Sequence, residues 1–392
     1  MYKLLFVALL LTFLVTIALF ALQKKDSTVQ RSNAEEKPFL NRSQETQLSG
    51  TYHQEDMFFE NKNSGIMLAG TLTLPKSKQP SSLAILIPGY GKHDRNLTGM
   101  GHESFLILAD YLTQRGIGVL RFDKRGVGQS TGNYDTATTQ DFADDVLAGV
   151  DYLKSRTDVD TSQIGLIGIS EGGLIASIVA AKSHDVTYAV LMAPAVQKNS
   201  DDLIEQTGLQ LKADGASEGF VVQDRELRKK LYTIIIDESD YGVAEKKLQN
   251  LVTNYLASLS ESQKDEAKTL PFAFTDAKKD ILIKTFNSPW YHFFLKYDRT
   301  ASLEQITKPV LVLNGTVDWI ATPYKIFPVV SQALQRAGNK DYKMIELPNL
   351  NHMFQTAKTG SFAEYATIKQ AIAPVVLETI TNWVLERTVK NK

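Results

Sequence analysis

Cysteine is absent from the 392-residue sequence. Without thiols the chain forms no disulfide framework, no thiolate zinc site, no iron–sulfur cluster and no cysteine nucleophile. An excess of charge is also missing, because 43 basic and 44 acidic side chains give a formal net charge of -1. No basic footprint marks the sequence, so nucleic acid is a poor candidate partner. The hydrophobic content of 43% is that of a globular protein, either one large α/β domain with an insertion or two modest domains.

A long apolar run lies near the N-terminus. Residues 4–22 are apolar apart from two threonines and are flanked by lysines. The run is long enough to cross a bilayer, whereas a cleaved signal peptide has a shorter apolar core and small residues at its cleavage site. Segment 1–22 is therefore expected to be a membrane anchor, with a cleaved signal peptide as the alternative, and segment 23–50 a polar tether. The protein is expected to be membrane-anchored or exported, with its large domain outside the cytoplasm.

Alternating apolar runs and amphipathic stretches make up the rest of the chain. A hairpin is expected around Asn63-Ser64-Gly65, a turn signal between two apolar segments. Beyond it, short buried strands alternate with helices, which predicts right-handed crossovers and a mostly parallel sheet. The expected strands are 56–60, 66–72, 83–87, 118–122, 164–169, 187–192, 310–314 and 342–347, and the expected helices are 105–115, 141–155, 172–182, 323–337 and 368–386.

The alternation stops at Pro194 and resumes at Pro309. This break predicts an α/β core in two parts, 51–195 and 304–392, with an insertion at 196–303. Apolar residues of the insertion share one helical face, so a helical cap is expected; they are Leu248, Leu251, Val252, Tyr255 and Leu256. Its last part, 290–297, is rich in aromatic side chains. These form either a core seam between insertion and main domain, an apolar wall over a substrate pocket, or both.

A Gly-x-Ser-x-Gly motif, Gly168-Ile169-Ser170-Glu171-Gly172, lies between a predicted strand and a predicted helix. A nucleophile elbow needs this context, because its serine sits in a strained turn that accepts only small residues two positions away on either side. The alternative is a glycine-rich turn without catalysis, which leaves the glycines without a steric reason. The motif therefore predicts Ser170 as a catalytic nucleophile.

A serine hydroxyl needs a base, and the base needs an acceptor that holds its tautomer. Among the six histidines, His352 alone follows the last predicted strand on a loop before the final helix. Asp318 comes just after strand 310–314, at the edge where sites on open parallel sheets form. An aspartate at such a place can also serve as a helix cap or turn former. The chain order Ser170, Asp318, His352 matches that of an α/β-hydrolase triad.

An acyl-transfer site also needs amide donors for the oxyanion. We expect one to be the backbone amide of Glu171, directly after the nucleophile, and the other the amide of Tyr90, on the glycine-containing loop after strand 83–87. The Tyr90 side chain and the Asp94-Arg95 pair either shape the pocket or form a solvated turn. The glycine-rich loop 123–132 lacks the features of a phosphate loop, so it is interpreted as a loop beside the site.

These segments resemble the α/β-hydrolase superfamily, and within it the bacterial carboxylesterases of the EstD type and the serine aminopeptidase-like (S33-type) hydrolases. The resemblance runs from Glu55 to the final helix and rests on the elbow and on segments 88–96, 123–128 and 288–298. Ile169 and Tyr90 depart from the pattern, since relatives often carry histidine at the first position and a small residue at the second. The resemblance implies an α/β-hydrolase fold, the three triad roles given above, no metal and no organic cofactor.

The expected activity is hydrolysis of carboxylic esters through an acyl-enzyme on Ser170, with His352 as general base and acid and Asp318 as its orienting group. The expected partners are a small-molecule ester and, through the N-terminal segment, a membrane. Three alternative functions remain open. One is an acyltransferase, which would use the same triad but exclude water, and another is a non-catalytic binding module, which would be expected to have lost a triad member. A peptidase or aminopeptidase would use the same triad with an anionic anchor, for which the cap offers Asp201, Asp202 and Glu205.

Overall fold

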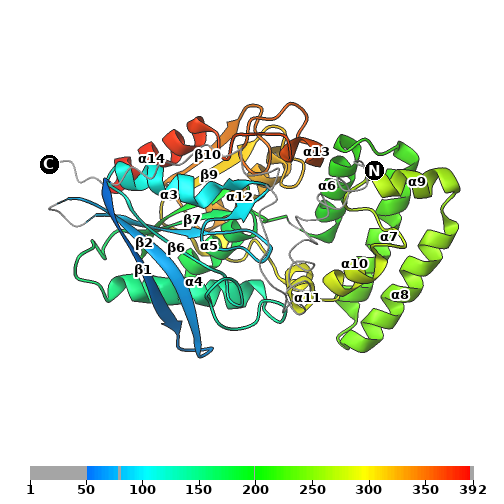
Figure 1. Ribbon diagram of the computed structural model, residues 1–392, viewed down its shortest axis with the longest axis horizontal. Coiled ribbons are helices and arrows are strands. Elements are labelled where there is room, and N and C mark those ends of the chain that lie inside the picture. The colour runs from blue at the N-terminus through cyan, green and yellow to red at the C-terminus, as the bar shows by residue number, and fades with distance from the viewer. Residues whose placement is uncertain (1–50, 78–80, 198, 389–392) are drawn as a thin grey trace, which may run out of the picture.

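The computed structural model describes residues 51–77, 81–197 and 199–388. The predicted anchor 1–22 and the predicted tether 23–50 lie outside these residues, so both segment assignments stay predictions. Within the described part of the chain, no helix is long and apolar enough to span a membrane. The described chain forms a twisted sheet covered by helices on both faces, with a lobe of helices at one end (Figure 1).

The sheet has eight strands in the order β1-β2-β6-β3-β7-β8-β9-β10. β1 pairs antiparallel with β2 and β2 antiparallel with β6, while every other neighbouring pair is parallel. The central strands are buried along their whole length, as expected for strands covered on both faces. The strands are β1 (Tyr52–Asn61), β2 (Ile66–Pro75), β3 (Leu83–Ile87), β6 (Gly118–Phe122), β7 (Ile164–Ile169), β8 (Val186–Met192), β9 (Val310–Gly315) and β10 (Tyr342–Leu347).

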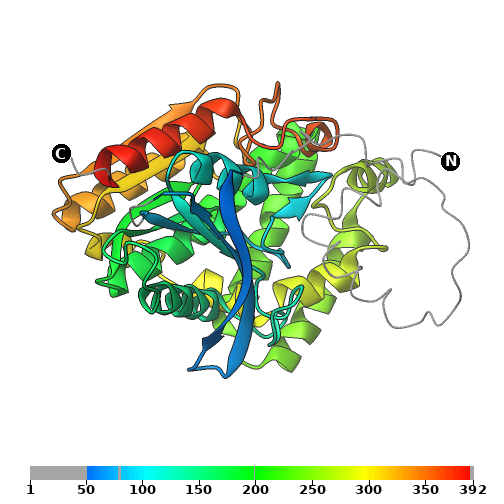
Figure 2. The same ribbon diagram turned by 60° about the vertical axis from the view of Figure 1, so that its left-hand side comes forward.

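Helices cover both faces of this sheet. α3 (Ser104–Gln114) and α14 (Pro374–Thr388) lie against each other on one face, and α4 (Thr139–Lys154) and α5 (Glu171–Lys182) lie together on the other (Figures 1 and 2). α4 begins with a capping box, in which Thr138 and Asp141 exchange side-chain and backbone hydrogen bonds. The remaining core elements are α12 (Pro323–Arg336), α13 (Phe362–Tyr365), the 3₁₀ turn η2 (Leu303–Gln305) and the short ribbon of β4 (Thr98–Gly99) and β5 (His102–Glu103).

The predicted helical cap is present between β8 and β9, where it forms the separate lobe seen in Figure 1. It has its own apolar core, to which the predicted face of α8 contributes Leu248, Val252 and Leu256. The helices of this lobe are α6 (Ser200–Ala213), α7 (Glu218–Asp237), α8 (Tyr241–Ser258), α9 (Glu261–Thr269), α10 (Lys279–Phe286) and α11 (Pro289–Lys296).

One predicted helix is wrong at its start. The final helix was expected over 368–386, but α14 begins only at Pro374. Proline disfavours a helical conformation in the residue before it and is well suited to the first turn of a helix, where its missing N–H costs nothing. The preceding residue, Ala373, instead donates its backbone N–H to Phe354 O at 2.8 Å. Residues 368–373 therefore form a loop that is tied to the segment following His352.

Candidate active site

The elbow places Ser170 between β7 and α5 in a strained backbone conformation. Ser170 has φ 56° and ψ −119°, a region that residues with a side chain rarely adopt. The two flanking glycines are required by close backbone approach. A Cβ on Gly168 would lie 2.0 Å from Gly172 O, and a Cβ on Gly172 would lie 2.0 Å from Ile87 O. The structure thus gives the motif the steric reason that the sequence predicted.

Asp318 and His352 meet at the carboxyl ends of β9 and β10. His352 Nδ1 and Asp318 Oδ2 are 2.9 Å apart, and both side chains are buried. The other carboxylate oxygen, Oδ1, accepts hydrogen bonds from the backbone N–H groups of Ile320 and Ala321, each at 2.9 Å. Because the carboxylate accepts, Nδ1 carries the imidazole proton and Nε2 is left as the basic nitrogen.

A cavity of about 230 Å³ connects the elbow serine to the Asp318–His352 pair, since Ser170 and His352 both line it. No hydrogen bond joins the Ser170 hydroxyl to His352 in the described structure. Such contacts are often long in an unliganded enzyme and shorten when substrate binds. The cavity walls are mostly apolar and include many aromatic side chains, and the cap helices α6, α7, α10 and α11 contribute to them.

Two backbone amides next to Ser170 are free to donate. Neither the N–H of Tyr90 nor that of Glu171 bonds to any residue in the described ranges, and both residues line the cavity. The loop after β3 lies close to the serine, because a Cβ on Gly89 would be 3.2 Å from Ser170 Cβ. The structure therefore brings the predicted nucleophile, base, acid and amide donors to one end of the sheet.

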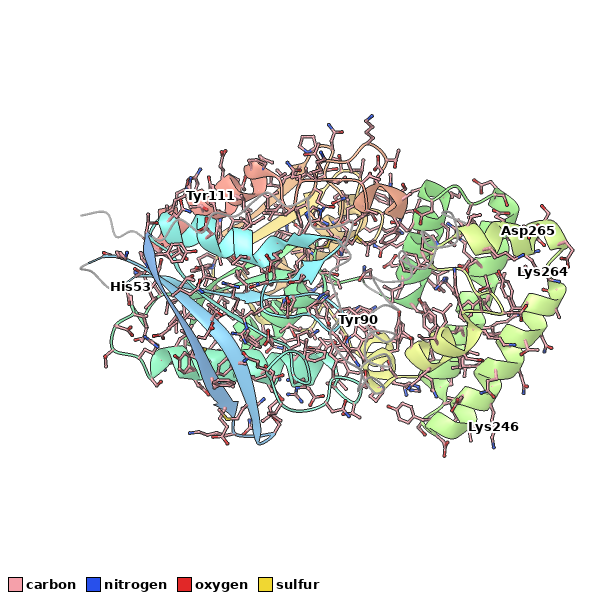
Figure 3. All side chains as sticks on the ribbon, in the orientation of Figure 1. His53, Tyr90, Tyr111, Lys246, Lys264 and Asp265 are labelled. Atoms are coloured by element: carbon pink, nitrogen blue, oxygen red, sulfur yellow. The ribbon has the colours of Figure 1, made fainter. Side chains whose placement is uncertain are left out.

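The aromatic run 290–297 has both of its predicted roles. Trp290 and Phe294 are buried in the main core cluster and also line the cavity. The Tyr90 side chain faces the cap lobe from the end of β3 (Figure 3), with its ring centroid 4.2 Å from that of Trp290. Tyr90 thereby connects the core of the protein to α11 and narrows the cavity between them.

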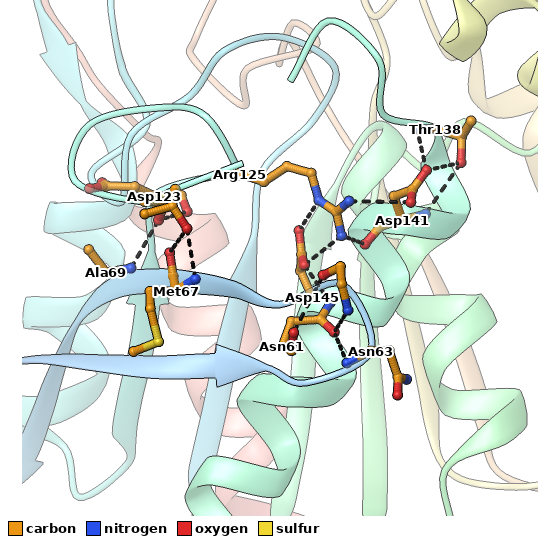
Figure 4. Close-up of polar contacts among 12 residues, drawn as sticks. Asn61, Asn63, Met67, Ala69, Asp123, Arg125, Thr138, Asp141 and Asp145 are labelled. Atoms are coloured by element: carbon orange, nitrogen blue, oxygen red, sulfur yellow. Dashed lines mark hydrogen bonds and ion pairs between the residues drawn. The ribbon is translucent and has the colours of Figure 1, made fainter. Parts of the chain in front are cut away.

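The loop 123–132 lies beside the site, as predicted, and is held by ion pairs. Arg125 binds Asp145 of α4 through two hydrogen bonds of 2.7 Å, and Asn61 of β1 binds the same carboxylate at 2.8 Å (Figure 4). Arg95 pairs with Asp123 at 2.9 Å. Neither Arg95 nor its neighbour Asp94 lines the cavity. The pocket-shaping role is therefore not supported for this pair. Asp94 forms a turn by accepting hydrogen bonds from the Asn96 and Thr98 N–H groups, whereas the Arg95 side chain is only 13% exposed and so is not solvated as the alternative expected.

One group at the site was not predicted from the sequence. Lys124 and the Glu171 side chain form a buried ion pair, with Nζ 3.3 Å from Oε2. Thr139 Oγ1 donates to Glu171 Oε1 at 2.9 Å, and Trp290 Nε1 donates to the same oxygen. Burial lowers the pKa of the Lys124 ammonium, and the Glu171 carboxylate opposes this effect. The available signal was a charged residue at the second position after each of two buried strands, β6 and β7.

No cluster of metal-ligating side chains is found in the part of the chain that the structure describes. His93, which lines the cavity, is instead bound to the backbone, with Nε2 2.9 Å from Tyr90 O. Since a carbonyl only accepts, Nε2 carries a proton. Burial and the nearby Lys124 charge lower the pKa of His93 to about 4, so its imidazole is neutral near pH 7.

A sequence profile of the serine aminopeptidase S33 family matches residues 79–357, which is more than half of the chain. The chain belongs to this family. Esterase EstD of Thermotoga maritima is 23% identical over 331 residues, covering 84% of this chain and 68% of EstD. Among solved structures, esterase Pf2001 of Pyrococcus furiosus has a TM-score of 0.51 at 16% identity, over 93% of this chain and 98% of Pf2001. The α/β-hydrolase GrgF from Penicillium has a TM-score of 0.50 at 16% identity, over 86% of this chain and 99% of GrgF. These matches confirm the predicted α/β-hydrolase fold and family.

Proposed function

We propose that this protein is a serine carboxylesterase that forms an acyl-enzyme on Ser170. The observation that carries the proposal is the buried hydrogen bond of 2.9 Å between His352 Nδ1 and Asp318 Oδ2, at a cavity shared with an elbow serine and two free amides. Similarity to the EstD esterase supports ester hydrolysis as the reaction. The elbow geometry supports Ser170 as the attacking group.

The mechanism follows from these positions. Ser170 Oγ attacks the ester carbonyl while His352 Nε2 takes its proton. The developing oxyanion is stabilised by the N–H groups of Tyr90 and Glu171, a type of interaction worth about 10²- to 10³-fold in rate per donor. His352 then gives the proton to the leaving alcohol, and a water activated by the same nitrogen releases the acid. Asp318 keeps the imidazole in the required tautomer and stabilises its protonated form.

The charges near the site favour an ester over a peptide with a free amino terminus. An aminopeptidase would need an unpaired carboxylate to bind the substrate ammonium. Two of the acidic cap residues, Asp202 and Glu205, instead form ion pairs with Lys325, and neither lines the cavity. Glu171 does line the cavity, but its carboxylate is already bound by Lys124, Thr139 and Trp290. No anionic anchor is left free among the described lining residues.

The cavity also bears on substrate size. Its volume of about 230 Å³ is below the range of about 300–1,000 Å³ that is typical of pockets for drug-sized ligands. Its walls are mostly apolar, with Leu203, Leu282 and Phe286 among the cap contributions. We therefore propose short, apolar acyl groups as substrates and expect the cap to select acyl length.

Labelling with a fluorophosphonate, followed by mass spectrometry of the modified peptide, tests this proposal. The wild-type protein is expected to be modified at Ser170 and to cleave short p-nitrophenyl esters. Ser170→Ala should remove both the label and turnover without unfolding the protein. Ser183→Ala, at the other end of α5, is the matched control and should retain both. Turnover by purified Ser170→Ala protein would show that another group is the nucleophile.

A further inference from the structure

The ion pair of Lys124 and Glu171 lies directly behind the two free amides and has no part in the mechanism above. The side chains of Lys124 and Glu171 are 4% and 1% exposed, so both charges are removed from solvent. Burying two charges is costly, and an apolar pair of similar volume is often equally stable or more so. Stability alone is therefore a weak reason for placing an ion pair here. Its contacts point to a role in the geometry of the site.

Lys124 controls the direction of one amide donor. Its Nζ donates to Gly89 O at 3.0 Å, and Gly89 O belongs to the same peptide unit as the Tyr90 N–H. The described chain has no cis peptide bonds, so the carbonyl and the N–H of this unit point in opposite directions. Fixing Gly89 O on Lys124 consequently fixes the direction of the Tyr90 N–H. A charged donor on the carbonyl also polarises the amide and strengthens its N–H as a donor.

The next peptide of the loop is held as well. His93 Nε2 donates to Tyr90 O at 2.9 Å, and the Gly91 N–H donates to Tyr134 Oη at 2.9 Å. The Tyr134 ring in turn lies 5.3 Å from Lys124 Nζ. Tyr90 is thus held through the carbonyl on each side of its α-carbon, while its own N–H stays free.

Glu171 fixes the second donor from the other end of the ion pair. Its carboxylate accepts hydrogen bonds from three different elements, through Lys124, Thr139 and Trp290. Because Glu171 is the first residue of α5, restraint of its side chain also restrains the backbone that carries its N–H. One ion pair therefore connects the residue that orients the Tyr90 amide to the residue that supplies the other amide.

We propose that the Lys124–Glu171 ion pair is a positioning device that sets the relative placement of the two oxyanion donors. This inference rests on the proposed function, since it assigns a role in the same acyl-transfer step. Lys124 and the Glu171 side chain are positioning residues, because they act on the amides and make no contact with the reacting atoms. Trp290 brings the cap into the same cluster, so docking of α11 supports the arrangement.

The test compares Lys124→Met with wild-type full-length protein on a short p-nitrophenyl ester. A misplacement of about 1 Å in a catalytic site costs about 10²-fold, so kcat should fall by about 10- to 100-fold. KM should stay within about twofold, since the amides bind the transition state more strongly than the ester. The affinity for a trifluoromethyl ketone, whose adduct carries an oxyanion, should fall by the same factor as kcat. The matched control is Lys278→Met, which removes another buried lysine that donates to a backbone carbonyl, Leu270 O at 2.8 Å, and should leave both values unchanged.

A second variant separates positioning from folding. Lys124→Met leaves the Glu171 charge buried and unpaired, which is strongly destabilising. Lys124→Met with Glu171→Gln removes that charge while keeping an oxygen for Thr139 and Trp290, and it should show the same loss of kcat in a folded protein. A folded variant with wild-type kcat, or a loss that appears only in KM, would overturn the positioning role. If wild-type protein cleaves no ester, the proposed function fails and this inference fails with it, whereas active wild type beside fully active variants overturns the inference alone.

Discussion

Replacing Asp318 by asparagine should abolish activity through the tautomer of His352. At present Asp318 Oδ1 accepts from the N–H groups of Ile320 and Ala321, and Oδ2 faces His352 Nδ1. An asparagine must keep its oxygen toward the two backbone donors, so its NH₂ group would face Nδ1. Nδ1 must then accept, which moves the imidazole proton to Nε2. The nitrogen that should take the Ser170 proton would no longer be basic.

The size of the effect follows from the serine-protease case of the same substitution. There the asparagine variant loses about 10⁴-fold in kcat, equivalent to about 5 kcal/mol of transition-state stabilisation. We expect a loss of that order for Asp318→Asn. The free energy of unfolding should change by no more than about 1 kcal/mol, because both backbone hydrogen bonds to Oδ1 are kept.

The assay is kcat on a short p-nitrophenyl ester, combined with urea unfolding. Asp318→Ala is the comparison, because it removes the acceptor from two N–H groups and should cost about 1–3 kcal/mol of stability for each one that is left unpaired. Loss of activity with retained stability should thus mark the asparagine variant alone. A folded Asp318→Asn protein with kcat within about tenfold of wild type would refute the tautomer argument.

Two further predictions concern stability. Burial raises the pKa of Asp214, at the end of α6, from 3.8 to about 6, so its neutral form is favoured in the folded state. This contribution to the free energy of unfolding is fully present below the pKa of the unfolded state and is lost as the pH rises through the pKa of the folded state. Asp214→Asn should remove this decline, and at about pH 8 the variant should be more stable than wild type by about 1–3 kcal/mol in urea unfolding. No difference between the two proteins at that pH would contradict the burial argument. Gly172→Ala places a Cβ 2.0 Å from Ile87 O, a backbone atom that cannot turn aside, and should cost more than about 4 kcal/mol by thermal unfolding. Gly219→Ala in α7, where a Cβ meets nothing within 4 Å, should be neutral or stabilising, and equal losses in the two variants would count against the steric reading.

Much of the core could be predicted from local patterns. The bounds of β3, β6, β7 and β10 match the expected strands. β3 and β7 are uninterrupted apolar runs, as expected for strands buried on both faces. Ser170 was found from the Gly-x-Ser-x-Gly motif, and Asp318 and His352 from their places just after predicted strands, because polar residues after the carboxyl ends of parallel strands meet at one edge of the sheet. The start of α14 was missed because an amphipathic pattern continued through Pro374, where backbone geometry decides the boundary.

The Lys124–Glu171 pair could not be predicted in this way, because it depends on the order of the strands. Lys124 follows β6 and Glu171 follows β7, and neither local segment indicates that the other is near. The sheet places β3 between these two strands, so the loop that carries Gly89 and Tyr90 emerges between the two charges. An ion pair joining the loops on either side must therefore pass beside the Gly89–Tyr90 peptide, where Lys124 also reaches Gly89 O. The strand order that brings the nucleophile and the oxyanion loop together is thus the same feature that allows one ion pair to restrain both amide donors.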